Sequence, residues 1–343
     1  MKWLRYIGAV LLLALAVVGI WWLTARLHTR YVIWSPKGTE QQVAKELPYA
    51  KYTFVRLAST QPVASTVVVG DETGKGKGYT VRDFSYMVSG KKVTGQLHIP
   101  DGVGPFPTIL MVRGYADVAT YTTGLGTRPA AEYYSSHGYL TVAPDMLGYG
   151  GSDPADTDPL GARLVRPVEI LDLLASIPTL RLADPERVYL WGHSNGGQIS
   201  LSVLEIMGGL KQNGLDGNIP KLRAAVLWAP VSKPFPYSVL VYMDEEADGG
   251  KALRKMVADF ETQYNADDFS IANYWNWITT PVQVEQGTGD QLVPYWWTND
   301  LVKALKAGGD KVSYFTYPGA DHNLSTGWST AVARDVQWFD TLK

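Results

Sequence analysis

Short apolar runs alternate with longer amphipathic stretches from residue 79 to the end of the chain. The first two runs, 79–88 and 91–99, flank Ser89-Gly90, which predicts an opening β-hairpin. Further strands are predicted at 107–112, 139–145, 187–192, 224–229, 281–286 and 312–317. Helices are predicted at 130–137, 164–177, 195–207, 295–306 and 330–342. This order is typical of a mostly parallel sheet, here of eight strands, with helices on both faces.

Residues 231–278 interrupt the alternation, because they join two predicted strands that one helix could connect. The stretch is rich in aromatic residues, and we expect it to form a small helical cap. Loops at the carboxyl ends of parallel strands surround the usual ligand site of such sheets. The cap should therefore cover that site, either as a mobile lid or as a fixed wall.

The amino-terminal residues differ from the rest of the chain in hydropathy. Residues 6–25 carry no charge, and a helix of that length spans roughly 30 Å, the hydrocarbon thickness of a bilayer. Trp21 and Trp22 at its far end fit a membrane interface. The only A-x-A sequence of the run lies in its middle, which favours an uncleaved anchor over a signal peptide. A buried helix of a soluble domain is the alternative.

We therefore divide the chain into three parts: a single-pass membrane anchor (1–30) in contact with the lipid bilayer, a stalk with a short N-terminal β segment (31–78), and the main domain (79–343). The glycine-rich stretch 70–78 is interpreted as the end of the stalk. Basic residues flank the anchor almost equally on both sides, and we predict that the main domain lies outside the cytoplasm.

Composition narrows the possible chemistry. The 343 residues are 46% hydrophobic, which is enough for a large core, and the net charge is −2. The first thirty residues hold four basic and no acidic residues, so the rest of the chain is acidic and a nucleic-acid partner is not expected. With no cysteine, thiolate nucleophiles and disulfide frameworks are excluded. No metal-ligand spacing or nucleotide fingerprint occurs, so no cofactor is predicted.

A G-x-S-x-G sequence, centred on Ser194, lies between the strand 187–192 and the helix 195–207. A nucleophilic serine needs a sharp strand-to-helix turn with a strained backbone. Glycine at Gly192 and Gly196 lets neighbouring chain segments approach such a turn closely. The pattern therefore predicts Ser194 as a nucleophile, and a serine that only caps a helix is the alternative.

In this arrangement an acid and then a histidine follow the serine along the chain. Of five histidines only His322 follows Ser194, on the loop after the last predicted strand, and we predict that it is the general base. His193, inside the turn, is expected to point away from the site. Asp290 follows the strand 281–286 and is predicted to orient the imidazole. Other nearby acids, interpreted as charges outside the site, are Glu285, Asp310 and Asp321.

An oxyanion needs two N–H donors, one from the residue after the nucleophile and one from the loop after the strand 107–112. These positions predict the N–H groups of Asn195 and Tyr115, with the Tyr115 hydroxyl as a further candidate. Alternatively, Tyr115 belongs to an ordinary turn at the end of a strand and does not bind the oxyanion.

From about residue 84 to its end, the chain resembles the α/β-hydrolase superfamily and, more narrowly, the catalytic domains of prolyl oligopeptidase (S9-type) serine peptidases. The stretches that carry the resemblance are PFPTILMVRGY, GYLTVAPDMLGYGGSD, DPERVYLWGHSNGGQISL, GTGDQLVPYWWTNDLVKAL and YPGADHNL. The resemblance implies an α/β-hydrolase fold. It implies the same catalytic residues, Ser194, Asp290 and His322, and the same oxyanion donors, Asn195 and Tyr115.

The chain departs from the family pattern at two points. Arg113-Gly114 stands where many members have histidine-glycine, and no β-propeller precedes the catalytic domain. Exopeptidase specificity is therefore not carried over. The resemblance favours a serine hydrolase that forms an acyl-enzyme, as a peptidase on short peptides. The alternatives are a carboxylesterase on small esters and a membrane-anchored binding module without catalysis, and the oligomeric state stays open.

Overall fold

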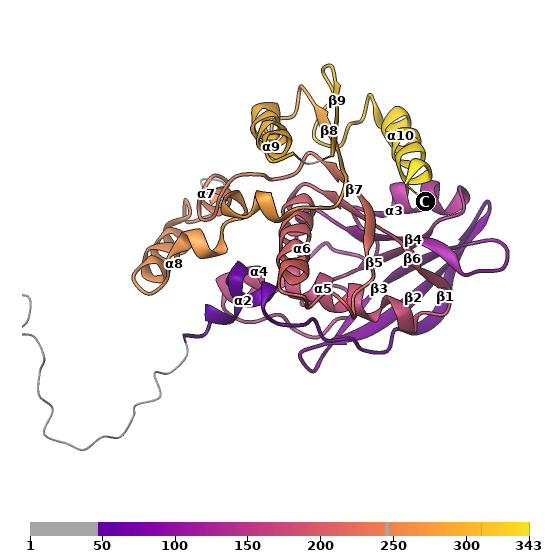
Figure 1. Ribbon diagram of the computed structural model, residues 1–343, viewed down its shortest axis with the longest axis horizontal. Helices are drawn as coiled ribbons and strands as arrows, with labels where there is room; N and C mark the ends of the chain where they lie inside the picture. Colours follow the sequence, from indigo (N-terminus) through magenta and orange to yellow (C-terminus); the bar gives the residue numbers. More distant parts are fainter. Residues whose placement is uncertain (1–46, 244–246, 310, 343) are drawn as a thin grey trace, which may run out of the picture. The chain divides into compact units, whose positions relative to one another are not determined.

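A nine-stranded sheet is the central element of the computed structural model, which describes residues 47–243, 247–309 and 311–342 (Figure 1). The strand order across the sheet is β1-β2-β3-β5-β4-β6-β7-β8-β9. The strands are β1 (Val68–Gly76), β2 (Tyr79–Val88), β3 (Lys91–Pro100), β4 (Phe106–Val112), β5 (Leu140–Pro144), β6 (Ala183–His193), β7 (Leu222–Trp228), β8 (Val282–Gly287) and β9 (Val312–Tyr317).

Six strands of this sheet, β4 to β9, run in one direction. The pairs β1/β2, β2/β3 and β3/β5 are antiparallel, and every other neighbouring pair is parallel. The carboxyl ends of β4 to β9 therefore lie at one edge, and the loops that follow them meet there. This arrangement confirms the prediction of a mostly parallel sheet that opens with a hairpin.

The sheet has one strand more than the eight that the sequence predicts, because β1, which lies within the predicted stalk and short β segment (31–78), pairs with β2 and belongs to the same sheet. This strand lies at the edge of the sheet, pairs only with β2, and has register shifts along that pairing. Its residues are mostly exposed and three of them are glycines, so no apolar alternation marks the strand in the sequence. The sheet begins at Val68 and not at Tyr79.

Helices cover both faces of the sheet, as predicted. The α-helices of the described residues are α2 (Phe54–Ala58), α3 (Arg128–Ser136), α4 (Pro159–Leu164), α5 (Arg166–Ser176), α6 (Asn195–Gln212), α7 (Tyr237–Leu240), α8 (Lys251–Glu261), α9 (Tyr295–Ala307) and α10 (Trp328–Thr341). Strand β4 shows how the chain divides its apolar side chains. Leu110 and Val112 pack in the core that holds α5, α6 and α9, whereas Ile109 and Met111 pack in the core of α3 and α10.

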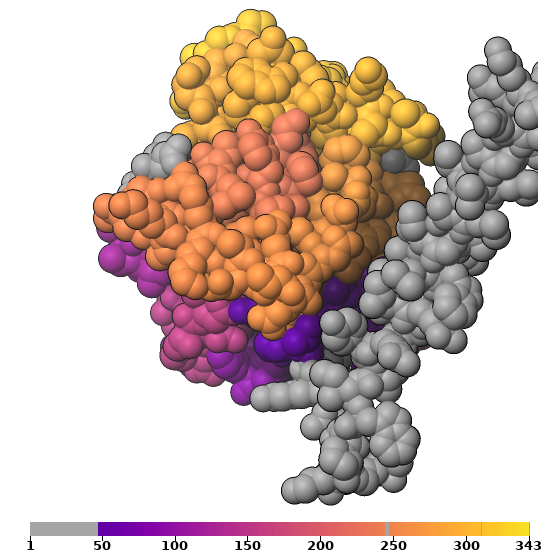
Figure 2. All heavy atoms as spheres, turned by 90° about the vertical axis from the view of Figure 1, so that its left-hand side faces the viewer, coloured from indigo at the N-terminus to yellow at the C-terminus, as the bar shows by residue number. Residues whose placement is uncertain are grey.

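The segment between β7 and β8, which contains the predicted cap 231–278, consists of short helices. Its described residues include α7, α8 and the short 3₁₀ helices Ala266–Phe269, Ile271–Asn273 and Trp275–Trp277. Phe235, Phe260 and Phe269 form a small apolar cluster of their own, which also includes Leu160 of α4. In Figure 2 this segment (orange) covers the middle of one face, between C-terminal residues (yellow) and residues of the described N-terminal part (indigo). Its function as a cap stays a prediction.

The predicted anchor, residues 1–30, and the part of the stalk up to residue 46 lie outside the described residues. Within the described ranges no helix combines the length and hydropathy that a bilayer span requires.

Candidate active site

Ser194 lies at the turn between the end of β6 and the start of α6. Its backbone has φ 58° and ψ −121°, a region that residues other than glycine rarely adopt. The turn is held by β7 and the residues after it. The N–H of Ser194 donates to the carbonyl oxygen of Trp228 (2.9 Å), and its own carbonyl oxygen accepts from the N–H of Val231 (3.1 Å). The side chain of Ser194 is thereby presented at the carboxyl edge of the sheet.

The two glycines of the motif are required by close packing. A Cβ atom on Gly192 would overlap Ser200 Oγ and the carbonyl oxygen of Gly196. A Cβ atom on Gly196 would overlap the carbonyl oxygen of Val112, at the end of β4. Any other residue would push α6 away from the sheet, so this is the close approach that the sequence pattern predicts.

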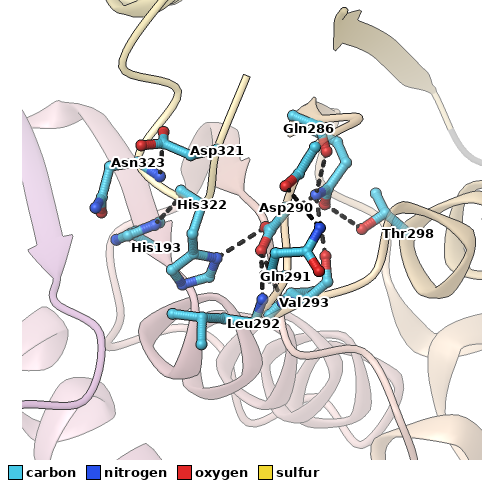
Figure 3. A network of polar contacts seen from close by, with 12 residues as sticks. His193, Gln286, Asp290, Gln291, Leu292, Val293, Thr298, Asp321, His322 and Asn323 are labelled. Carbon is cyan, nitrogen blue, oxygen red and sulfur yellow. Dashed lines mark hydrogen bonds and ion pairs between the residues drawn. The ribbon is translucent and has the colours of Figure 1, made fainter. Parts of the chain in front are cut away.

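His322 and Asp290 are hydrogen-bonded partners. Nδ1 of His322 lies 2.8 Å from Oδ2 of Asp290 (Figure 3). The other oxygen, Oδ1, accepts from the backbone N–H groups of Leu292 and Val293, each at 2.9 Å. Burial by itself would raise the pKa of Asp290, but the hydrogen bond from His322 and those from the backbone lower it on balance. The carboxylate is therefore ionised at neutral pH and can orient the imidazole.

The loops that carry these two residues are joined by hydrogen bonds, because they follow the neighbouring parallel strands β8 and β9. The N–H of Thr288 donates to the carbonyl oxygen of Tyr317 (3.0 Å), and the N–H of Gly289 donates to that of Ala320 (2.9 Å). Thr288 Oγ1 accepts from the N–H of Gly319 (2.8 Å). The acid and the histidine, 32 residues apart in the chain, are thereby held together.

Gln286, a residue that the sequence analysis missed, holds the Asp290 carboxylate by a hydrogen bond. Its Nε2 donates to Asp290 Oδ2 (3.1 Å) and to the carbonyl oxygen of Val293 (3.2 Å). Its Oε1 accepts from the hydroxyl of Thr298 on α9 (2.6 Å). Gln286 is fully buried, and a glutamine at the end of the predicted strand 281–286 was the available signal.

His193 contacts His322, which corrects the expectation that it points away from the site (Figure 3). Its Nε2 lies 3.0 Å from the carbonyl oxygen of His322, and the two rings lie 4.7 Å apart. Burial, followed by the charge of His322, lowers the pKa of His193 to about 4. The imidazole is therefore neutral at pH 7, and it donates its Nε2–H to that carbonyl oxygen.

This contact places His322 directly beside the turn that holds Ser194. The Ser194 hydroxyl and the His322 ring are not hydrogen-bonded to each other in this structure. In enzymes without substrate such bonds are often long, and they tighten in the substrate complex.

The positions predicted for the oxyanion donors surround Ser194. Asn195 begins α6, where backbone N–H groups have no partner within the helix. The loop after β4 passes next to the serine, because a Cβ atom on Gly114 would lie 3.1 Å from Ser194 Cβ and 3.7 Å from its Oγ. Tyr115 follows in this loop, and its side chain is 81% exposed.

Arg113 locks the same loop. Its Nη1 donates to the carbonyl oxygen of Gly114 (2.8 Å), and its Nη2 donates to that of Asp145 (3.0 Å). The guanidinium carbon lies 4.5 Å from the ring centre of Tyr121 and 4.0 Å from that of Tyr149. The arginine that departs from the family pattern is thus a buried brace of the loop.

A cavity extends from Asn195 along α6. Side chains of α2, of the junction between α4 and α5, and of the segment between β7 and β8 complete its wall. Its lining residues are Tyr52, Phe54, Leu57, Arg163, Leu164, Arg166, Pro167, Asn195, Gln198, Ile199, Ser202, Ile206, Phe235, Phe269 and Ile271. Among the described residues, no group of three or more histidine or acidic side chains is placed to hold a metal ion.

Comparison with curated proteins finds relatives among esterases. The chain is 27% identical over 155 residues to Esterase FrsA of Shigella boydii serotype 18 and, over the same length, to Esterase FrsA of Escherichia coli O1:K1. Each match covers 44% of this chain and 32% of the relative, so the chain spans about a third of the length of these relatives.

Solved structures with the same fold include peptidases and esterases. A putative dipeptidyl aminopeptidase IV from Bacteroides ovatus aligns with TM-score 0.58 at 16% identity over 78% of this chain and 36% of its own. The acylaminoacyl peptidase of Pyrococcus horikoshii aligns with TM-score 0.58 at 17% identity, over 78% and 42%. Acetyl xylan esterase 1 from Thermoanaerobacterium aligns with TM-score 0.53 at 16% identity, over 83% and 93%. At these identities the likeness concerns the fold.

A sequence model of the alpha/beta hydrolase family matches residues 109–334. The match extends from β4 to α10 and includes the serine turn and the loops of Asp290 and His322. It covers more than half of the 343 residues, and it confirms the resemblance to the α/β-hydrolase superfamily that the sequence shows. The chain belongs to the alpha/beta hydrolase family.

Proposed function

We propose that this serine hydrolase cleaves small esters or amides through a covalent acyl-enzyme on Ser194. The observation that carries the proposal is the 2.8 Å contact between His322 Nδ1 and Asp290 Oδ2, made beside the strained turn of Ser194. A base that is oriented by a carboxylate and lies next to an activated serine is the arrangement that acyl transfer requires.

The reaction follows from the proposed roles. Ser194 Oγ attacks the carbonyl carbon of the substrate while Nε2 of His322 takes its proton, and Asp290 stabilises the imidazolium that results. The N–H groups of Asn195 and Tyr115 stabilise the negative oxygen of the tetrahedral intermediate. His322 then returns the proton to the leaving group. A water molecule, activated by the same histidine, releases the acyl group and restores Ser194.

A peptidase on short peptides is one candidate. The resemblance of the sequence to prolyl oligopeptidase catalytic domains supports it, and so do the peptidases among the solved structures with this fold. Cleavage of a peptide bond requires that His322 protonates an amine, which is a poorer leaving group than an alcohol or phenol.

A carboxylesterase on small esters is equally supported. The curated relatives are esterases, and the chain matches nearly the whole length of the acetyl xylan esterase but less than half of either peptidase. Fold alone does not select between the two bonds, because related sites cleave both.

The test compares initial rates on an aryl ester and an aryl amide of the same acyl group. We expect that the wild-type protein hydrolyses at least the ester. Ser194→Ala should lower kcat/KM about a thousandfold or more, because the nucleophile is lost. Amide cleavage that depends on Ser194 selects the peptidase, and ester cleavage alone selects the carboxylesterase. Activity that survives in Ser194→Ala would exclude the proposed nucleophile.

Asp290→Asn tests the role of the acid. We expect kcat to fall about a thousandfold or more, because an amide cannot hold the imidazole in the required tautomer. Asp321→Asn is the control, since this neighbouring carboxylate is exposed and accepts hydrogen bonds from Asn323 and Ser325 of its own loop. If neither substrate is cleaved and a fluorophosphonate does not label Ser194, the proposed hydrolase is excluded, and the chain is better explained as a binding module without catalysis.

A further inference from the structure

Arg163 is a cation in the wall of the cavity beside Asn195, and it has no carboxylate partner in the described part of the chain. It belongs to the last turn of α4. Of its five guanidinium N–H groups, one has an acceptor among the described residues, Oε1 of Gln198 at 2.8 Å from Nη2. Burial lowers the pKa of Arg163 to about 10, so the side chain is still charged at neutral pH.

The neighbouring arginine of the same cavity shows the contrast. Arg166 donates to Oε1 of the buried Glu169 (2.8 Å) and to the carbonyl oxygen of Leu147 (3.0 Å). Its charge is thus neutralised within the fold. A partly buried cation without such a partner costs stability, and it is typical of a site whose anion arrives with a ligand.

Arg163 is connected to α6 through its hydrogen bond to Gln198. Gln198 lies three residues after Asn195, which corresponds to about 4.5 Å along a helix axis. Gln198 is itself held in place, because its Nε2 donates to the hydroxyl of Ser238 on α7 (3.0 Å). Arg163 is thus linked to the first turn of α6, the helix that begins at Asn195, and both residues line the same cavity.

The rest of the cavity wall fits a compact organic group with one anionic end. The described residues of the lining include no acidic side chain, and most of them are apolar. The apolar side chains are Phe54, Leu57, Leu164, Ile199, Ile206, Phe235, Phe269 and Ile271. Among the described residues of the lining, Arg163 is the cation without a carboxylate partner, and an apolar cavity with such a cation favours a ligand that carries a carboxylate.

We propose that Arg163 binds a carboxylate of the substrate, and that this enzyme prefers acyl compounds that carry an anionic group a few carbons from the scissile bond. The inference rests on the proposed function of the Ser194 site. The carboxylate belongs either to the acyl half, as in a half-ester of a dicarboxylic acid, or to the leaving half, as at the carboxyl end of a short peptide.

The test uses matched pairs of substrates on both halves. For the acyl half, 4-nitrophenyl esters of adipic acid and of its neutral half-amide are compared. For the leaving half, the acetyl esters of 4-hydroxybenzoate and of 4-hydroxybenzamide are compared. We expect kcat/KM of the wild-type protein to be about tenfold or more higher for the anionic member of one pair. The pair that shows the preference identifies which half carries the carboxylate.

Arg163→Gln should abolish this preference, so that kcat/KM becomes the same for the anionic and the neutral member of the pair. Arg163→Lys, which keeps the charge, should retain much of the preference. Arg181→Gln, which removes an exposed charge elsewhere, is the control and should change nothing. An unchanged preference in Arg163→Gln, or no preference of the wild-type protein in either pair, would overturn the proposal. If Arg163→Gln does not fold, the wild-type ratio and Arg163→Lys decide.

Binding to the Ser194→Ala protein separates this inference from the proposed function, because it needs no turnover. In calorimetric titrations, the anionic member of one pair, either the monomethyl ester of adipic acid or 4-acetoxybenzoate, should bind at least tenfold more tightly than its neutral amide, and Arg163→Gln should remove the difference. Equal binding of the two compounds, together with equal binding of 4-acetoxybenzoate and 4-acetoxybenzamide, would contradict the role of Arg163 even if the enzyme is an active hydrolase.

Discussion

His322 is held from two sides, by Asp290 at its ring and by His193 at its backbone. Both contacts are at least partly buried, and each such hydrogen bond contributes on the order of 1 kcal/mol. The ring of the proposed base is therefore placed by its neighbours before a substrate arrives. His193 is a positioning residue, since it acts on the reaction through His322.

His193→Phe tests this role, because phenylalanine fills the space but cannot donate to the carbonyl oxygen of His322. We expect kcat to fall about tenfold, with KM and melting temperature little changed, since roughly 1.4 kcal/mol of positioning is lost. His193→Gln keeps a donor and should recover part of the rate. His137→Gln, at an exposed helix end, is the control. A drop in melting temperature with unchanged kcat would show that His193 is only structural.

Three elements meet at the serine turn. Strand β6 enters it, α6 leaves it, and Gly196 lies against the carbonyl oxygens of Val112 and Arg113 at the end of β4. Arg113 then holds the loop after β4 through Gly114 and Asp145. The strain at Ser194 persists because these elements leave its backbone no space to relax.

Gly196→Ala should disrupt this junction, because its Cβ would overlap backbone atoms that cannot move independently. We expect the free energy of unfolding to fall by roughly 2–4 kcal/mol, measured by denaturant titration, with loss of activity. Gly217→Ala is the matched control, since nothing lies within 4 Å of its Cβ position. Equal stability of the two variants would contradict the close packing at Gly196.

Buried polar groups also connect the elements on the face of the sheet that α3 and α10 cover. Asp335 of α10 accepts from the Tyr134 hydroxyl (2.7 Å), Trp228 Nε1 (2.9 Å) and Gln283 Nε2 (2.9 Å). Glu285 of β8 lies nearby, and its side chain is fully buried. Burial, followed by the charge of Asp335, raises the pKa of Glu285. The folded chain therefore holds a proton on Glu285 at a pH at which the unfolded chain has released it.

The raised pKa of Glu285 contributes stability that is fully present below pH 4.5, the ordinary pKa of a glutamate side chain. This contribution is lost as the pH rises. Glu285→Gln stays neutral, so at pH 8 its free energy of unfolding should exceed that of the wild type by about 1 kcal/mol or more. The two proteins should converge near pH 4.5. Glu186→Gln, at an exposed position, should show no such trend. A difference that stays constant with pH would contradict the raised pKa.

Local rules explain why so much of the architecture can be predicted from residue order. Apolar runs of strand length alternate with helical patterns, and this dictates a parallel sheet whose carboxyl ends meet at one edge. Ser194, Asp290 and His322 each follow a predicted strand, so their neighbourhood follows from the topology. The glycine spacing around Ser194 is likewise a local requirement of one turn. Membrane anchoring by residues 6–25 is likewise predicted from a local pattern. It stays a prediction, because these residues lie outside the described part of the chain.

The contacts that shape the site have no local signal. Arg163 and Gln198 are 35 residues apart, and His193 meets a carbonyl oxygen 129 residues away, so their roles emerge only when α4, β6 and the loop after β9 are packed together. Strand β1 has little apolar surface to bury and exists because β2 offers an open edge. Sequence patterns record what each segment buries, whereas the partner of a polar group depends on which segments the folded chain places beside it.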